Sequence, residues 1–273
     1  MAQPPSSTGM NCRNCGSRLQ GSFCSDCGQE ARNLDLSLRQ LLGELFGNLV
    51  SFDSRVWRTA VPLLFRPGDL TARYLAGQRV RFVPPIRLYV FVSIVYFLLL
   101  ALLSPEIQVV RGTTEAPDME TAQEVVEGLD DSRAAGAFAD DPERLRRRFL
   151  QGFSYLMFLL MPLFGGLLKV VYAGRGRPYL HHLLFAVHFH AFLFVLLVLT
   201  VLLEASGVGL LTFVGGALPT LAIPVYLVVA LRRVYGGRWW TTLLRTGVLG
   251  FSYLVVLSAA VSAMAYTIYN FWR

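Results

Sequence analysis

The sequence predicts a mainly α-helical, polytopic membrane protein with a small cysteine-rich module at its N-terminus. Hydrophobic residues make up 54% of the chain and charged residues 16%, and the mean hydropathy is +0.48. Soluble globular domains carry fewer apolar and more charged residues. We therefore divide the chain into a cysteine ribbon at 1–31, an amphipathic, interfacial helical segment at 32–86 and a transmembrane helical bundle at 87–273.

Four cysteines stand in two Cys-x-x-Cys pairs in the N-terminal module: Cys12, Cys15, Cys24 and Cys27. Such pairs let thiolates converge on one tetrahedral ion, and a glycine follows each pair, where a tight knuckle needs positive φ. Disulfides are less favoured because residues 1–11 lack the apolar stretch of a signal peptide. A redox pair and an iron–sulfur cluster fit the context less well. The spacing predicts a zinc ribbon with one structural Zn²⁺ held by all four thiolates.

Two amphipathic helices are predicted between the ribbon and the first long apolar run. Leucines and a phenylalanine recur at helical spacing over 36–50, with polar residues on the opposite face. A second helix, from about Asp53 to Phe65, carries Trp57 and other apolar residues beside arginines. We expect Asp69 to cap a further short helix that Gly77 closes.

Arginines are concentrated after this short helix, at Arg73, Arg79, Arg81 and Arg87. At a membrane surface each would contribute about 1 kcal/mol through anionic head groups. We therefore predict that these four contact anionic lipids. A ligand site built on Arg66, Arg79 and Arg81 remains an alternative.

Several linked motifs resemble one bacterial membrane family. They are F-C-S-D-C-G-Q at Phe23–Gln29, F-R-P-G-D at Phe65–Asp69, Y-L-A-G-Q-R at Tyr74–Arg79, R-F-V-P-P-I-R-L-Y at Arg81–Tyr89 and, more weakly, the histidine-rich stretch His181–His190. Together they are similar to the domain-of-unknown-function family 3667. The resemblance implies a zinc ribbon joined to a polytopic membrane domain, and it implies no reaction, substrate or catalytic residue.

Five apolar stretches are long enough to cross a bilayer as helices. They run from about Leu88 to Ser104, Phe153 to Tyr172, His181 to Leu203, Val208 to Leu231 and Gly247 to Phe271. The fourth contains Gly215-Gly216, Pro219 and Pro224, which predict either a broken helix or, more simply, close helix packing and a kink. We expect about five transmembrane helices.

Charges in the connecting segments predict the orientation. Residues 1–87 hold eleven Arg against six acids, whereas the loop at 105–151 holds six Arg against eleven acids. Arginines return between the second and third spans and between the fourth and fifth. The positive-inside rule then puts the N-terminus in the cytoplasm and the C-terminus outside. The resemblance to a bacterial family implies that the membrane is the inner (plasma) membrane. Four arginines at 144–148 disagree with this orientation.

The acidic loop at 105–151 is predicted to be a solvated segment. Its stretch 118–129 is consistent with a short surface helix, and Asp141-Pro142 predicts the start of the helix that leads into the second span. Carboxylate pairs in the loop lack the glycine-turn spacing of a calcium site.

All four histidines of the chain lie in the third predicted span, 181–203, or at its start. Imidazoles in hydrocarbon need a hydrogen-bond partner or a water-filled cavity, so such residues are candidates for function. Hydrogen bonding between helices is the simplest interpretation. A ligand or proton site at His181, His188 and His190 remains open, and metal or haem ligation is disfavoured by the spacing.

Three functions remain open from the sequence. We expect a non-enzymatic membrane protein whose cytoplasmic ribbon faces lipid or a cytoplasmic protein partner. A small-molecule transporter or channel using the histidine-bearing span is the alternative, and a lipid-modifying membrane enzyme is a weaker one. No nucleophile–base motif or phosphate loop is present, and the sparse arginines of the ribbon do not favour nucleic-acid binding.

Overall fold

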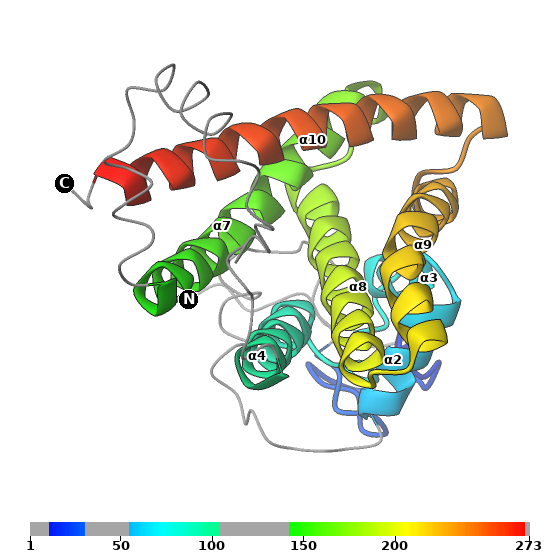
Figure 1. Cartoon of the computed structure of the whole chain (residues 1–273). Helices are drawn as coiled ribbons and strands as arrows, with labels where there is room; N and C mark the ends of the chain where they lie inside the picture. Colours follow the sequence, from blue (N-terminus) through cyan, green and yellow to red (C-terminus); the bar gives the residue numbers. More distant parts are fainter. Residues whose placement is uncertain (1–10, 31–54, 104–141, 271–273) are drawn as a thin grey trace, which may run out of the picture.

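A computed structural model describes residues 11–30, 55–103 and 142–270, which form a helical bundle with a small ribbon beside it (Figure 1). The helices are α2 (Arg55–Phe65), α3 (Asp69–Leu75), α4 (Pro85–Leu103), α7 (Pro142–Val171), the 3-10 turn η1 (Ala173–Arg175), α8 (Tyr179–Ala205), α9 (Gly209–Tyr235) and α10 (Trp239–Asn270). The helix predicted at 36–50, the surface helix at 118–129 and most of the acidic loop lie outside the described residues. The mainly helical fold class is confirmed.

Helix α8 forms the centre of the bundle. Every residue from 182 to 192 is buried, and α8 packs against α4, α7 and α9, while α10 lies across the bundle in Figure 1. A helix that is apolar on all sides is stable only when neighbours or lipid cover it completely. The apolar third span therefore became the buried core, and the other long helices expose apolar side chains on their outer surfaces.

Each of the five predicted spans coincides with a helix. Among the described residues, α4, α8, α9 and α10 are long and apolar enough to cross a membrane. The second predicted span corresponds to α7, which begins at Pro142 as predicted. The apolar part of α7, Tyr155–Val171, is shorter than those of the other four helices.

Helix α9 is continuous through its glycines and prolines. Pro219 and Pro224 lie inside it, so the broken-helix alternative is not what the structure contains. Gly215 packs against α8, where an added Cβ would lie 3.2 Å from Cβ of Leu203 and 3.3 Å from the carbonyl oxygen of Thr200. Close helix packing is therefore the role of this glycine.

Helix α3 corrects one sequence prediction. Asp69 is the first helical residue and does not cap the helix, because Gly68 occupies the N-cap position with φ of 75°. The C-terminal end is as predicted: Gly77 has φ of 95°, its amide donates to the Tyr74 carbonyl, and the Gln78 amide donates to the Arg73 carbonyl. These two bonds define a Schellman motif.

Helix α2 is amphipathic, as predicted, but its most apolar face points away from the bundle. Thr59, Pro62 and Leu63 are buried, whereas Trp57, Val61 and Phe65 are exposed by 76%, 46% and 77%. The three exposed residues are four apart and share one side of the helix. A helix with such a stripe suits the surface of a bilayer.

Candidate metal centre and its attachment to the bundle

The ribbon consists of two knuckles with the same backbone pattern, twelve residues apart in the sequence. In the first, the Gly16 amide donates to the Cys12 carbonyl and the Cys12 amide to the Ser17 carbonyl. In the second, the Gly28 amide donates to the Cys24 carbonyl and the Cys24 amide to the Gln29 carbonyl. Both glycines have positive φ, 84° and 71°. This backbone geometry is the reason glycine follows each pair.

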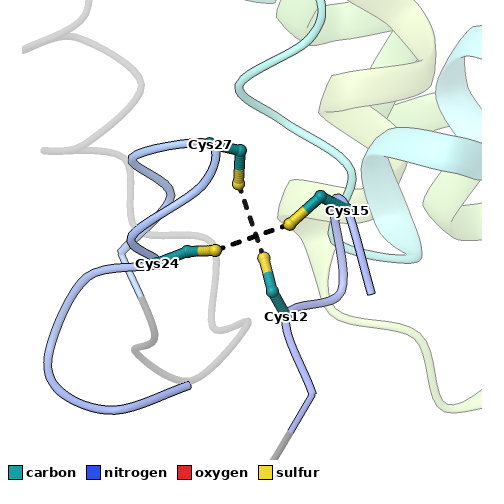
Figure 2. Close-up of side chains that lie close together, drawn as sticks. All are labelled: Cys12, Cys15, Cys24 and Cys27. Atoms are coloured by element: carbon teal, nitrogen blue, oxygen red, sulfur yellow. Dashed lines mark hydrogen bonds between the residues drawn. The ribbon is translucent and has the colours of Figure 1, made fainter. Parts of the chain in front are cut away.

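The knuckles bring the four predicted ligands together (Figure 2). Sγ of Cys12 lies 3.6 Å from Sγ of Cys27, and Sγ of Cys15 lies 3.4 Å from Sγ of Cys24. All four sulfurs lie within 4.8 Å of one another. A tetrahedral thiolate site with metal–sulfur bonds of about 2.3 Å has sulfurs about 3.8 Å apart. The four cysteines can therefore hold one metal ion.

The environment of Cys15 favours its metal-binding form. The hydroxyl and the backbone N–H of Ser17 stabilise the thiolate and lower the pKa of Cys15 to about 6. A thiol must lose its proton to bind a metal. The four sulfurs are also too far apart for a disulfide, which needs a bond of about 2.05 Å. Free thiols grouped in this way fit a metal centre.

The second knuckle attaches the ribbon to the helical bundle through Gln29. Its Nε2 donates to the Gly77 carbonyl at 2.8 Å, and its Oε1 accepts from the Arg79 amide at 3.3 Å. The backbone carbonyl of Gln29 is bonded to the Cys24 amide. One residue therefore joins the metal knuckle to the turn that closes α3.

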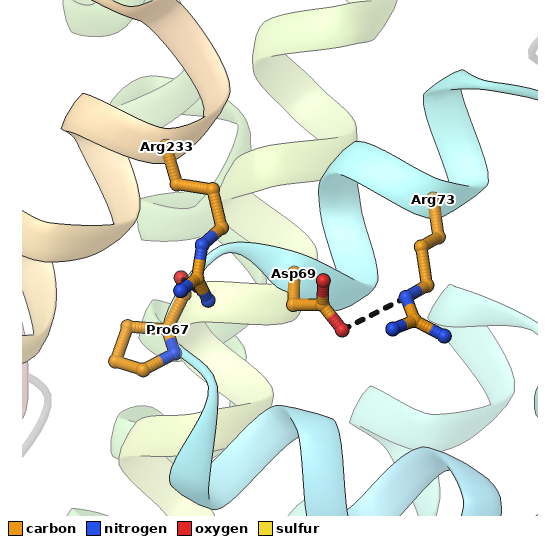
Figure 3. A network of polar contacts seen from close by, with 4 residues as sticks. All are labelled: Pro67, Asp69, Arg73 and Arg233. Atoms are coloured by element: carbon orange, nitrogen blue, oxygen red, sulfur yellow. Dashed lines mark hydrogen bonds and ion pairs between the residues drawn. The ribbon is translucent and has the colours of Figure 1, made fainter.

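The F-R-P-G-D segment attaches α3 to α9 (Figure 3). A Cβ on Gly68 would lie 2.8 Å from the Ala230 carbonyl oxygen, so only glycine fits. Arg233 donates to the Pro67 carbonyl at 2.8 Å, and Asp69 pairs with Arg73 at 2.9 Å. This motif is thus a docking site for α9.

The four arginines predicted to contact lipid lie on and after α3, and all are half-buried. Arg73 pairs with Asp69, and the guanidinium of Arg79 lies over the Tyr74 ring at 5.6 Å. Arg81 and Arg87 follow in the entry to α4. Contact with anionic lipid stays a prediction for all four.

Three histidines of α8 make hydrogen bonds to three different helices. His188 Nδ1 lies 2.9 Å from Oγ1 of Thr71 in α3. His182 Nδ1 lies 2.8 Å from the Tyr235 hydroxyl at the end of α9, and His190 Nε2 lies 2.9 Å from the Tyr253 hydroxyl of α10. His181, which was predicted to form a candidate ligand or proton site with His188 and His190, is only half-buried.

The partners of these histidines were not predicted from the sequence. For His190 the roles follow from chemistry, because its Nδ1 faces the Ala186 carbonyl at 2.8 Å and must donate, so Nε2 accepts from Tyr253. Thr71, Tyr235 and Tyr253 carry no motif that marks them. The one available signal was general: intramembrane polar groups need partners.

The described helices fit an integral membrane protein, and its four clustered cysteines could bind a metal ion. The family model described as "Protein of unknown function (DUF3667)" matches residues 53–97, so the predicted family resemblance is confirmed. The match contains α2, α3 and most of α4, with the F-R-P-G-D and Y-L-A-G-Q-R motifs. No curated protein and no solved structure matches the chain.

Proposed function

We propose that this protein is a multi-pass inner-membrane protein whose ribbon binds one structural zinc ion and forms a cytoplasmic interaction surface. The observation that carries the proposal is the Gln29 contact, because it fixes the ribbon against the turn at Gly77–Arg79. Zinc is the metal because four thiolates in a closed tetrahedron suit its borderline-soft character. A closed site leaves no position for substrate, so the ion stabilises and does not catalyse.

The arrangement of charges supports a cytoplasmic ribbon. The turn that Gln29 holds lies close to the end of α9, since α3 docks there through Arg233 and Ala230. Arginines also lie between α7 and α8, in the last turn of α9 and just before α10, whereas the last turn of α8 carries the acidic Glu204. The arginines at 144–148, at the start of α7, are the exception. A basic end and an acidic end agree with the positive-inside rule.

Two exposed apolar features support an interaction surface at this end. Phe23 of the ribbon is 63% exposed, although the ribbon has few large apolar residues. The stripe of α2, formed by Trp57, Val61 and Phe65, is also exposed. We assign the stripe of α2 to the bilayer surface and Phe23 to a cytoplasmic protein partner. The arginines at 73, 79, 81 and 87 would contact anionic head groups beside them.

Cysteine labelling tests the orientation. Ser206→Cys lies between α8 and α9, and Arg238→Cys lies between α9 and α10; both positions are exposed. In intact cells, a membrane-impermeant maleimide should label the first and reach the second only after permeabilisation. Reversed labelling would place the ribbon outside and sink the proposal. Affinity purification in mild detergent then compares wild type with Phe23→Ser, which should lose the protein partner and keep its zinc.

Transport is the second candidate, and one observation favours it. His188 is buried, and its Nε2 has no hydrogen-bond partner among the described residues. Such a nitrogen could exchange a proton or contact a solute. In proteoliposomes with a pH-sensitive dye, proton flux that is lost in His188→Gln supports transport. Equal flux in wild type, His188→Gln and empty vesicles rules out a proton path at this residue.

A further inference from the structure

Two connections between helices meet at the basic end of the bundle. They are the segment between α7 and α8 and the segment between α9 and α10. The rings of Tyr172 and Tyr235 stack with centroids 4.1 Å apart, and a Cβ on Gly237 would lie 3.2 Å from Nη2 of Arg175. Residues more than sixty positions apart therefore form one cluster.

Cations surround the two stacked tyrosines. The guanidinium carbons of Arg175 and Arg245 lie 5.4 and 5.0 Å from the Tyr172 ring centroid, and that of Arg177 lies 5.0 Å from the Tyr235 centroid. An aromatic face holds a guanidinium by cation–π attraction and leaves its N–H edges free for an anion. The tyrosines thus order three cations before any ligand binds.

No carboxylate among the described residues pairs with the three arginines of this cluster. Asp69 pairs with Arg73 on α3, away from this cluster, and Arg175, Arg177 and Arg245 make no salt bridge to a described carboxylate. Two like charges that converge on one ring repel each other, and an anion bound between them offsets that repulsion. The Tyr172 hydroxyl is buried and also has no hydrogen-bond partner among the described residues.

We propose that Arg175, Arg177 and Arg245, with the hydroxyl of Tyr172, form a binding site for a phosphate group. Arginine is suited to this ligand because its planar fork donates two parallel hydrogen bonds to phosphate oxygens. The site lies at the ends of membrane-spanning helices, at the level where anionic lipid head groups are found. It is separate from the arginines on and after α3, and it does not depend on zinc in the ribbon.

The test compares three single substitutions in the full-length protein in neutral detergent. Arg175→Gln and Arg245→Gln each remove one ring-bound cation. Arg238→Gln removes an exposed cation between α9 and α10 that contacts no aromatic ring among the described residues. Short-chain phosphatidylglycerol is titrated and binding is measured by native mass spectrometry. We expect a loss of affinity of tenfold or more in the first two variants and at most about fivefold in the third, the loss that a non-specific surface charge contributes. Equal losses in all three variants overturn the site.

Two further arms identify the source of the phosphate. Phosphatidylcholine is the lipid control, and binding as tight as that of phosphatidylglycerol with no effect of Arg245→Gln overturns the proposal. Inorganic phosphate that displaces phosphatidylglycerol supports a site open to free phosphates, while binding of phosphatidylglycerol alone supports a lipid head-group site. Melting temperatures of the lipid-free variants are measured alongside. If Arg245→Gln does not fold, Arg245→Lys keeps the charge without the fork and should still lose affinity.

Discussion

The ribbon and the helical bundle are stabilised by different physical forces. The described ribbon buries little besides Cys12, Leu19 and Cys24, which is too small a core for independent stability. The bundle has a continuous core that spans α3, α4, α7, α8, α9 and α10. The comparison indicates that a bound metal would supply most of the folding free energy of the ribbon, whereas side-chain packing supplies that of the bundle. Each unit should therefore be able to fail while the other stays folded.

Loss of the metal should have the largest effect, and only on the ribbon. Cys24→Ser removes a buried ligand, and structural zinc in small modules contributes about 10–16 kcal/mol. We expect zinc to fall from about one per chain to near zero, measured by atomic spectroscopy, with the melting temperature of the bundle unchanged. Ser25→Ala, beside the same cysteine, is the control. Full zinc content in Cys24→Ser would discredit the four-cysteine centre.

Gly68→Ala should affect the bundle and leave the zinc in place. The new Cβ would overlap the Ala230 backbone at 2.8–2.9 Å, and φ at this position is 75°. We expect destabilisation of about 2–5 kcal/mol from the clash and the strained backbone together. Gly176→Ala separates the two causes, since Gly176 has φ of 63° but open space around it. Similar melting temperatures for both variants would show that the contact with Ala230 contributes nothing.

Thr71→Val should weaken the bundle by a smaller amount. It leaves the buried Nδ1 of His188 without its partner, which costs about 1–3 kcal/mol. Thr212→Val is the matched control, because the hydroxyl of Thr212 is exposed and bonds only within its own helix. Detergent unfolding followed by circular dichroism measures both. A control variant that loses as much stability as Thr71→Val contradicts a structural role for this hydrogen bond.

Gln29→Ala tests the link between the units and should have the smallest effect on stability, because both lost hydrogen bonds are only part-buried and water can replace them. Two hydrogen bonds to the Gly77–Arg79 turn disappear, each worth about 0.5–1.5 kcal/mol, while the zinc site remains. Hydrogen exchange should become faster at the Arg79 amide, which donates to Gln29. Ser17→Ala changes the equivalent position of the first knuckle and should leave that amide protected. Unchanged exchange in Gln29→Ala means that the ribbon is not attached through this residue.

The sequence predicted the local features because their causes are local. Two Cys-x-x-Cys-Gly knuckles and five apolar runs carry their structure in a few adjacent residues, and Gly77 was predicted to close α3 from its own neighbourhood. The prediction for Asp69 was wrong because Gly68 adopts a left-handed conformation and becomes the N-cap. The left-handed conformation of Gly68 lets the backbone approach α9 closely. This contact with a distant helix cannot be predicted from the neighbouring residues in the sequence.

The chain alone determined that thiolates would converge near the N-terminus and that long apolar helices would follow. Tertiary packing decided which groups meet across the molecule. Gln29 reaches a turn 48 residues away, Thr71 reaches His188 across 117 residues, and two tyrosines distant in the sequence, Tyr172 and Tyr235, stack and hold arginines at one end of the bundle. Hydrophobic periodicity in the sequence predicts that a helix must bury its apolar side chains. The hydrophobic effect is non-directional, so it does not specify which helices cover it. The hydrogen-bond partners of the buried polar groups are therefore decided only by the packing of the whole bundle.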